Sequence, residues 1–330
     1  MIDISACITA VAGYVPPDKL TNADLETLVN TTHEWIVERT GIHERRILKG
    51  EKGTSTMAIE AVKCLCEKRG ITPQEIDAVI CATITPDMLF PCTANLVCDA
   101  LQISSLSFDL LAACTGFLYG LEIASNFIKS GNYKKVVVIG ADKMTSITDY
   151  EDRTSCILFG DGAGAVLLEP NYEGVGILDT LLQTDGKGKE ILYKKAGGSA
   201  FPITPQRLEQ KEHLFHQEGR QVYKHAVSRV SSTANTLLTR NQLKGEEIDF
   251  VVPHQANERI LASIGKRINI PYERFTINID HFGNTAGATI PLCLWEWEKQ
   301  FKPHHKLLLT AFGAGLTWGA MYLTWGYAAI

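Results

Sequence analysis

The sequence has few of the features that mark membrane, secreted or zinc-binding proteins. No apolar run reaches the roughly 18–20 residues that a membrane-spanning helix needs. The first fifteen residues lack the basic and apolar regions of a secretory signal. The nine cysteines include no CxxC pair and suggest no disulfide framework. The net charge of −5 provides no basic field for nucleic acid or an anionic membrane. A cytoplasmic protein with reduced thiols, and with no nucleic-acid or membrane partner, is therefore expected.

What is present predicts an α/β fold. The 330 residues are 45% hydrophobic and 21% charged, which is ample for a core. Short β-branched runs alternate with longer amphipathic stretches. Thr72, followed by a proline, predicts a short helix start before the strand at Ala78, whereas Asp185–Pro205 has the Gly, Lys and Pro content of a surface loop. The expected strands are Ala78–Thr83, Lys135–Ile139, Gly164–Leu168, Phe250–Val252 and Leu307–Leu309, and the expected helices are Met57–Arg69, Gly116–Lys129, Gln221–Thr239 and Glu258–Arg267.

A weak internal repeat divides the chain. Three pairs of segments recur in the same order at an offset of 171 or 172 residues, which predicts two duplicated halves, residues 1–172 and 173–330. Halves related by a pseudo-twofold axis would bring matching strand ends together, where a composite site could form. The matched segments are Glu75–Ile80 with Glu247–Val252, Val137–Gly140 with Leu308–Ala311, and Cys114–Gly116 with Thr285–Gly287.

Cys114 has the sequence surroundings of a nucleophile. An apolar strand-like run ends at this residue, a helix begins within one or two residues, and small neighbours leave room for a substrate. The helix N-terminus would favour a thiolate and offer N–H groups to a developing oxyanion. The alternative is that Cys114 is a small buried hydrophobic residue, as free cysteines often are.

His254 and Asn284 are candidate partners of this cysteine. His254 follows a predicted buried strand, and ligands bind at the C-terminal ends of strands in open α/β sheets. Asn284 lies in a glycine-bracketed turn before another helix. The alternatives are a hydrogen-bonded core histidine and an asparagine that serves a left-handed turn.

The glycine series Gly160–Gly164 does not fit a nucleotide-binding loop. Such a loop follows a strand and opens a helix, whereas these glycines precede a predicted strand. A tight turn is predicted instead, and a similar turn is predicted at Phe312–Gly315.

Together these segments resemble the β-ketoacyl-acyl-carrier-protein synthase III family over essentially the whole chain. The resemblance implies the five-layered αβαβα thiolase fold, a homodimer and no cofactor, with acyl-CoA and malonyl-acyl-carrier-protein as substrates. It also implies decarboxylative condensation at the start of fatty acid synthesis. The motifs that carry it are EWIVERTGI at 34–42, AACTGF at 112–117, FGDGAG at 159–164, VPHQAN at 252–257, GNT at 283–285 and AFGAGLTWG at 311–319.

The resemblance implies a role for each matching residue. Cys114 is the nucleophile that carries the acyl group, and His254 and Asn284 hold the malonyl thioester during decarboxylation. The backbone N–H groups of Cys114 and Ala314 form a second oxyanion hole. The other implied residues are Trp35 and Arg153 around the adenine of coenzyme A, Arg39 at its phosphates, Gly219 and Asn257 along the pantetheine arm, Phe90 and Phe312 at the acyl pocket, and Lys224, Arg259, Lys266 and Arg267 as the carrier-protein docking patch.

Several alternatives stay open at this point. The four basic residues would otherwise be read as a solvated helix face, and Phe90 as packed inside its own subunit rather than inserted into a neighbour. At the level of function, the rivals are a secondary-metabolism condensing enzyme or acyltransferase with the same triad, a nucleotide-dependent oxidoreductase built on Gly160–Gly164, and a non-catalytic scaffold.

Overall fold

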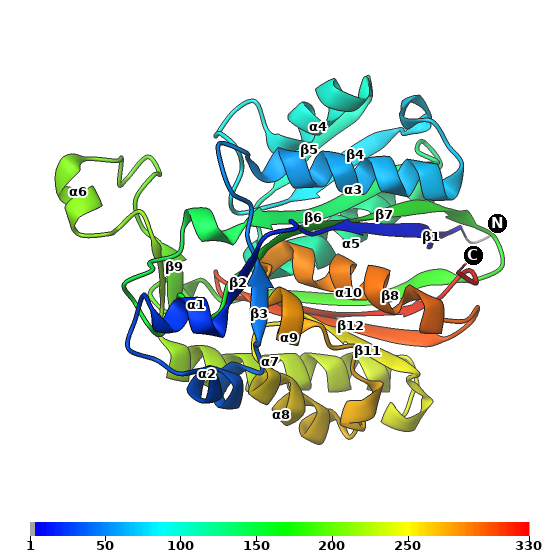
Figure 1. Cartoon of the computed structure of the whole chain (residues 1–330). Coiled ribbons are helices and arrows are strands. Elements are labelled where there is room, and N and C mark those ends of the chain that lie inside the picture. The colour runs from blue at the N-terminus through cyan, green and yellow to red at the C-terminus, as the bar shows by residue number, and fades with distance from the viewer. Residues whose placement is uncertain (1–3, 330) are drawn as a thin grey trace.

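The computed structural model describes residues 4–329 and contains five layers in the order α, β, α, β, α (Figure 1). Helices cover the outer face of each of two sheets and fill the space between them. The α/β class and the five-layered arrangement expected from the sequence are confirmed.

The first sheet has the strand order β1-β7-β6-β4-β5. The pairs β4–β6 and β4–β5 are parallel, whereas β7 is antiparallel to both β1 and β6. Alternate residues of β6 point to opposite faces: Val136 and Val138 join the cluster between the sheets, and Val137 joins the outer cluster. Burial on both faces explains the continuous β-branched run. The strands are β1 (Ser5–Tyr14), β4 (Ala78–Ala82), β5 (Leu106–Leu110), β6 (Val136–Lys143) and β7 (Asp161–Asn171).

The second sheet repeats this plan. Its order is β11-β12-β13-β8, with β11–β12 parallel and the other two pairs antiparallel. Strands β8, β13, β12 and β11 thus occupy the places that β1, β7, β6 and β4 occupy in the first sheet. The division expected between residues 172 and 173 falls in the turn between β7 and β8. The strands are β8 (Gly176–Thr184), β11 (Phe250–Pro253), β12 (Lys306–Gly313) and β13 (Thr317–Thr324).

Six helices form the three helical layers. Helices α3 and α4 cover the first sheet, α5 and α10 lie between the sheets, and α7 and α8 cover the second sheet (Figure 1). None of the helices between residues 4 and 329 combines the length and the apolar character that a bilayer crossing requires. The six are α3 (Thr54–Arg69), α4 (Thr93–Leu101), α5 (Gly116–Lys129), α7 (Gly219–Arg240), α8 (Glu258–Ile268) and α10 (Thr289–Trp297).

The tight turn predicted at Gly160–Gly164 is wrong, whereas the turn predicted at Phe312–Gly315 is present only in its second half, at Ala314 and Gly315. Residues 161–164 belong to β7, and Phe312 and Gly313 belong to β12. A Cβ at Gly164 would lie 2.7 Å from Pro291 Cβ, so α10 packs directly on the strand backbone. Glycine in β7 therefore serves close packing between layers.

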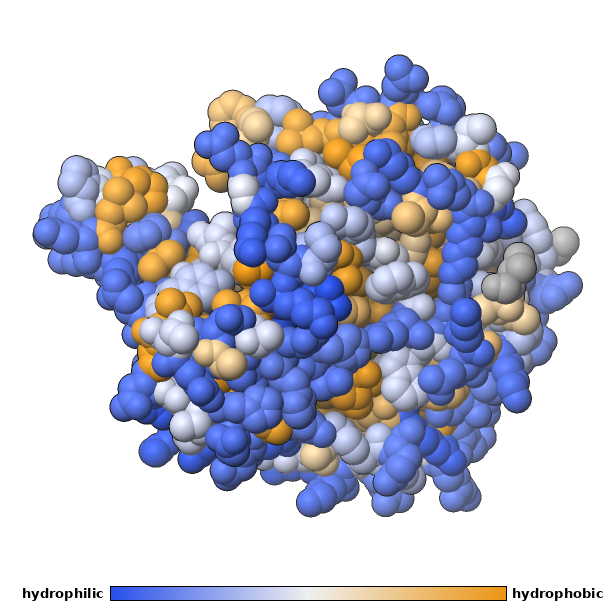
Figure 2. Space-filling view, in the orientation of Figure 1, coloured by the Kyte–Doolittle hydropathy of each residue, from blue (hydrophilic) through white to orange (hydrophobic). Residues whose placement is uncertain are grey.

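The stretch Asp185–Pro205 is only partly the surface loop that was expected. Its strand β9 (Leu192–Lys194) pairs with β10 (Phe215–Gln217), and Leu192 is buried. The segment between them, with α6 (Pro205–Glu209), projects from the body as an arm (Figure 1). Apolar side chains are exposed on this arm (Figure 2), namely Phe201, Ile203 and Leu208.

Smaller elements complete the chain. The predicted helix start at Thr72 is a 3₁₀ turn over Pro73–Glu75, with the expected capping box. The remaining elements are β2 (Lys19–Thr21), β3 (Glu44–Arg46), α1 (Asn22–Glu26), α2 (His33–Thr40) and α9 (Ile279–Phe282).

Candidate active site

One cavity of about 690 Å³ contains the three predicted catalytic residues. Cys114, His254 and Asn284 all line it, although they come from segments far apart in the sequence. A volume of this size suits a small-molecule ligand. The open end of the cavity is lined by the half-buried Trp35 and by exposed residues that include Arg39, Gly219, Arg220 and Arg259.

Cys114 lies between β5 and α5, in a short 3₁₀ turn over Ala113–Thr115. Ala113 has a φ of +48°, a costly conformation for a residue with a side chain. The end of β12 reaches this turn, since a Cβ at Gly313 would lie 2.9 Å from Cys114 N. Among residues 4–329, neither Cys114 N–H nor Ala314 N–H has a protein acceptor. Two unpaired donors near the thiol are what an oxyanion hole requires.

The thiol of Cys114 is protonated at neutral pH. Burial, followed by the nearby Asp142 carboxylate, raises the pKa of Cys114 to about 12. The side chain keeps some exposed surface, so water in the cavity offsets part of this desolvation. The N-terminus of α5 opposes the rise, but a helix terminus contributes at most about 2 kcal/mol, equal to roughly 1.5 in pKa. Desolvation therefore prevails over the helix effect expected from the sequence.

His254 follows the last residue of β11, as predicted, and is 5% exposed. Burial lowers its pKa to about 3, so the imidazole is neutral. Its Nδ1 lies 2.7 Å from the hydroxyl of Thr289, which also lies 3.0 Å from Ala286 O. Thr289 therefore fixes the ring orientation, and the Nε2 atom has no protein partner within residues 4–329.

Asn284 presents its amide N–H groups to the cavity. Its Oδ1 accepts a hydrogen bond from Ala286 N at 2.9 Å. This bond identifies the oxygen and the nitrogen of the carboxamide. Its backbone is held by Leu158 O and by Gly160 N. Asn284 is not in the left-handed region, because the positive φ values in this segment belong to Gly283 and Ala286. The alternative of an asparagine placed for left-handed backbone is therefore wrong.

The structure corrects the third segment of the internal repeat. The 3₁₀ turn over Ala286–Ala288 precedes α10 as the turn of Cys114 precedes α5, and Ala286 has the positive φ seen at Ala113. Cys114 thus corresponds to Gly287, not to Thr285. Sequence alignment of a few small residues could not fix this register.

Asp142, which sequence analysis missed, connects the turn of Gly287 to the segment that follows β4. This fully buried carboxylate accepts hydrogen bonds from Ile84 N and Gly287 N, both at 2.8 Å. Burial raises its pKa to about 6, although these hydrogen bonds oppose the rise. No motif indicated this role, because the partners of Asp142 are distant in sequence.

Trp35 lines the open end of the cavity and lies beside Arg153 as predicted, although Arg153 is not part of the lining and its side chain is in direct contact with the indole. The guanidinium carbon of Arg153 lies 4.4 Å from the Trp35 ring centroid, and that of Arg39 lies 5.7 Å away. A ring inserted between two planes needs about 7 Å, since each contact takes roughly 3.5 Å. Arg153 therefore has to move before an adenine can lie between the two side chains.

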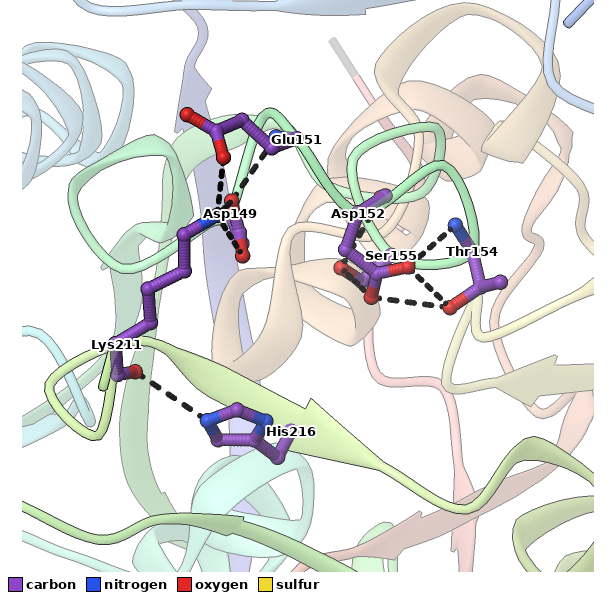
Figure 3. Close-up of polar contacts among 7 residues, drawn as sticks. All are labelled: Asp149, Glu151, Asp152, Thr154, Ser155, Lys211 and His216. Carbon is purple, nitrogen blue, oxygen red and sulfur yellow. Dashed lines mark hydrogen bonds and ion pairs between the residues drawn. The ribbon is translucent and has the colours of Figure 1, made fainter. Parts of the chain in front are cut away.

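Polar contacts stabilise the loop that carries Arg153 (Figure 3). On one side, Lys211 binds Asp149 and Glu151 at 2.9 and 2.7 Å. On the other, the Asp152 carboxylate accepts hydrogen bonds from its neighbours Thr154 and Ser155. Among residues 4–329, the Arg153 side chain has no hydrogen bond or ion pair of its own, and its contact is with the Trp35 ring.

The remaining predicted residues divide into three groups. Gly219, Asn257 and Phe312 line the cavity, although Asn257 already caps α8 and donates to Arg39 O at 2.8 Å. Phe90 lies outside the lining and is 83% exposed, so packing within its own subunit is wrong. The four docking candidates are exposed on α7 and α8 and form no ion pair within residues 4–329; of these, only Arg259 lines the cavity, whereas Lys224, Lys266 and Arg267 do not.

The comparisons agree with this geometry. Residues 108–186 match the family described as 3-oxoacyl-[acyl-carrier-protein] synthase III, and residues 238–325 match its C-terminal region. A β-ketoacyl-[acyl-carrier-protein] synthase III from Bacteroides thetaiotaomicron is 49% identical over 329 residues, covering 99% of this chain and 98% of the relative. The chain belongs to the β-ketoacyl-acyl-carrier-protein synthase III family.

Other members of the synthase III family show the same agreement. The relative from Chlorobaculum tepidum is 50% identical, covering 98% of this chain and 100% of that protein. The crystal structure of the enzyme from Aquifex aeolicus has a TM-score of 0.90 and 40% identity, covering 97% of this chain and all of the other. The fold and the family implied by the resemblance are confirmed.

Proposed function

We propose that this protein is an acyltransferase that condenses an acyl-CoA primer with malonyl-acyl-carrier-protein and so initiates fatty acid synthesis. The observation that carries the proposal is the single cavity that brings together a thiol, a neutral imidazole and a carboxamide whose oxygen is already engaged. No side chain in this set is charged at neutral pH, which suits a reaction whose charge develops on substrate oxygen atoms.

In the first step, Cys114 Sγ attacks the thioester carbonyl of acyl-CoA. The N–H groups of Cys114 and Ala314 stabilise the oxyanion, the bond from carbon to the coenzyme sulfur breaks, and the thiol proton leaves with coenzyme A. Because the resting thiol is protonated, its proton has to depart as the new bond forms. The acyl group remains on the cysteine as a thioester.

In the second step, malonyl-acyl-carrier-protein loses carbon dioxide and leaves an enolate. His254 Nε2–H and Asn284 Nδ2–H donate to the enolate oxygen. Nε2 carries the hydrogen when Nδ1 accepts the single hydrogen of the Thr289 hydroxyl, a bond that competes with donation of the same hydrogen to Ala286 O at 3.0 Å. The enolate carbon then attacks the acyl thioester, a carbon–carbon bond forms, and the Cys114 thiolate leaves and takes a proton from solvent.

The open end of the cavity supports acyl-CoA as the first substrate. Trp35 and Arg153 would take the adenine, and Arg39 and Arg220 supply positive charge for phosphates. The acidic carrier protein would dock on Lys224, Arg259, Lys266 and Arg267. No cofactor enters the proposed chemistry.

A homodimer in the cytoplasm completes the proposal. Phe90, Leu89 and Leu111 are each at least 79% exposed, and they follow the adjacent strands β4 and β5. Exposed apolar side chains of this size favour burial against another subunit, and a second copy is the occupant that we propose. The nine unpaired thiols suit a reducing compartment.

The proposal is tested by separating the two steps. His254→Ala and Asn284→Ala should still take an acyl group from acyl-CoA, but each should release carbon dioxide from malonyl-acyl-carrier-protein about 10²–10³ times more slowly. Decarboxylation at the wild-type rate in either variant would show that the residue is not an enolate donor.

A further inference from the structure

Two buried hydroxyl groups connect the turn of Cys114 to the turn of Ala314. Thr115 is 0% exposed and Thr317 is 9% exposed, and their Oγ1 atoms lie 2.7 Å apart. Thr115 is the residue that directly follows the nucleophile. Thr317 Oγ1 in turn lies 2.9 Å from Ala314 O. A chain of hydrogen bonds thus runs from the residue after one oxyanion donor to the residue that carries the other.

The hydrogens can be assigned along this chain. Thr115 Oγ1 also lies 2.6 Å from Ala112 O, but that carbonyl already accepts from Thr115 N at 3.2 Å. The direction that supports the turn of Ala314 is donation from Thr115 to Thr317 and from Thr317 to Ala314 O. If both hydroxyls point the other way, the bond between the two threonines persists. In that reversed direction Ala314 O loses its hydroxyl donor, so the direction from Thr115 through Thr317 to Ala314 O is the one that joins the two turns.

The turn of Ala314 needs such a support. Its far side is fixed by two backbone hydrogen bonds of 2.8 Å between Leu316 and Asp185. Its near side leaves β12 at Gly313, which lies close to Cys114 N. Between these points, the carbonyl of Ala314 is held within residues 4–329 by Thr317 alone.

We infer that the Thr115–Thr317 hydroxyl pair is a positioning element that sets the separation of the Cys114 and Ala314 N–H groups. The inference rests on the proposed function, in which those two groups bind the oxyanion at the acyl carbonyl. A small displacement of one donor weakens an oxyanion hole, because its effect depends on geometry prepared before the reaction. The pair acts through the backbone and does not touch the substrate.

The two oxyanion sites of the cavity make the inference testable. The Cys114–Ala314 site serves the acyl carbonyl, whereas His254 and Asn284 serve the malonyl thioester. Loss of the hydroxyl pair should therefore slow acylation and leave malonyl decarboxylation unchanged. A general loss of folding would slow both.

The test uses Thr115→Val, Thr115→Ser and Thr317→Val in the full-length protein. Either valine keeps the side-chain volume and leaves the other hydroxyl with a carbonyl partner, so the variants should fold. Thr115→Val should lower kcat for acylation from acetyl-CoA about tenfold at unchanged KM, and Thr115→Ser should restore the wild-type rate. Because the residues act as a pair, the double valine variant should lose no more than the worse single variant.

Thr233→Val is a matched control. It removes a buried threonine hydroxyl on α7 that bonds Gln183 and Trp318 and contacts neither turn, so acylation should be unaffected. Acylation by folded Thr115→Val at the wild-type rate would overturn the inference, as would an equal loss of decarboxylation. If the wild-type protein itself takes no acyl group, the proposed function fails instead.

Discussion

Replacing His254 by glutamine should make the protein less sensitive to mild acid. Burial holds the pKa of His254 at about 3, compared with 6.5 for the ordinary side chain. Between these values the unfolded chain binds a proton that the folded protein does not bind. Folding stability therefore falls as the pH drops below 6.5, and it is fully retained above that value. Glutamine has a polar side chain that does not titrate.

The size of the effect follows from the two pKa values. From pH 7.0 to pH 5.5 the proton linkage of His254 should remove about 1.2 kcal/mol of stability. Any folded-state pKa below about 4.5 gives nearly the same figure, so the result depends mainly on the histidine being buried and neutral. The raised pKa of Asp142 has the opposite sign, since stability rises as the pH falls through 6, but it is present in both proteins.

Urea unfolding at pH 7.0 and 5.5, at one fixed protein concentration, measures the difference. The wild-type protein should lose about 1.2 kcal/mol more than His254→Gln over this interval. An identical loss in the two proteins would mean that His254 titrates normally. The neutral-imidazole donor of the proposed mechanism would then be wrong.

Three further predictions concern activity. Phe90→Ala should shift kcat/KM toward hexanoyl-CoA over acetyl-CoA by up to about fourfold per added methylene, because each buried methylene contributes about 0.8 kcal/mol; an unchanged ranking in a folded dimer would contradict its place in the partner's pocket. Lys266→Glu should raise KM for malonyl-acyl-carrier-protein, more strongly at low salt, with KM for acyl-CoA unchanged; Lys266 is preferable to Arg259, which lines the cavity, and an equal rise in both values would argue against docking. Thr289→Val should slow malonyl decarboxylation about 10–100-fold, with Thr289→Ser restoring it; a wild-type rate in the valine variant would show that Thr289 does not set the tautomer.

Much of the fold was predictable because local patterns agreed with the final packing. The helix expected over Gly116–Lys129 coincides with α5, and the strand expected at Ala78 begins there. Glycine-rich β7 was misassigned at its start because glycine signals a turn by itself, whereas here it admits Pro291 of α10. The need for glycine here is imposed by α10, which is distant in sequence, so no pattern in the residues around β7 indicates it.

The site residues, too, divide into those that motifs identified and those whose roles depend on contacts between distant segments. The resemblance supplied Cys114, His254 and Asn284, and the structure places all three in one cavity. Thr289 and Asp142 were missed, because their roles rest on contacts between segments that are distant in sequence. The direct contact of Trp35 with Arg153 likewise depends on side-chain conformations that no motif encodes.

Intact-protein mass spectrometry after incubation with acetyl-CoA tests the central claim most directly. The wild-type protein should gain the mass of one acetyl group, and this mass should disappear when malonyl-acyl-carrier-protein is added. Cys114→Ala should gain nothing while remaining folded. An acetyl group on Cys114→Ala, or no acyl group on the wild-type protein with any acyl-CoA of a panel, would contradict the assignment of Cys114 as the acyl carrier.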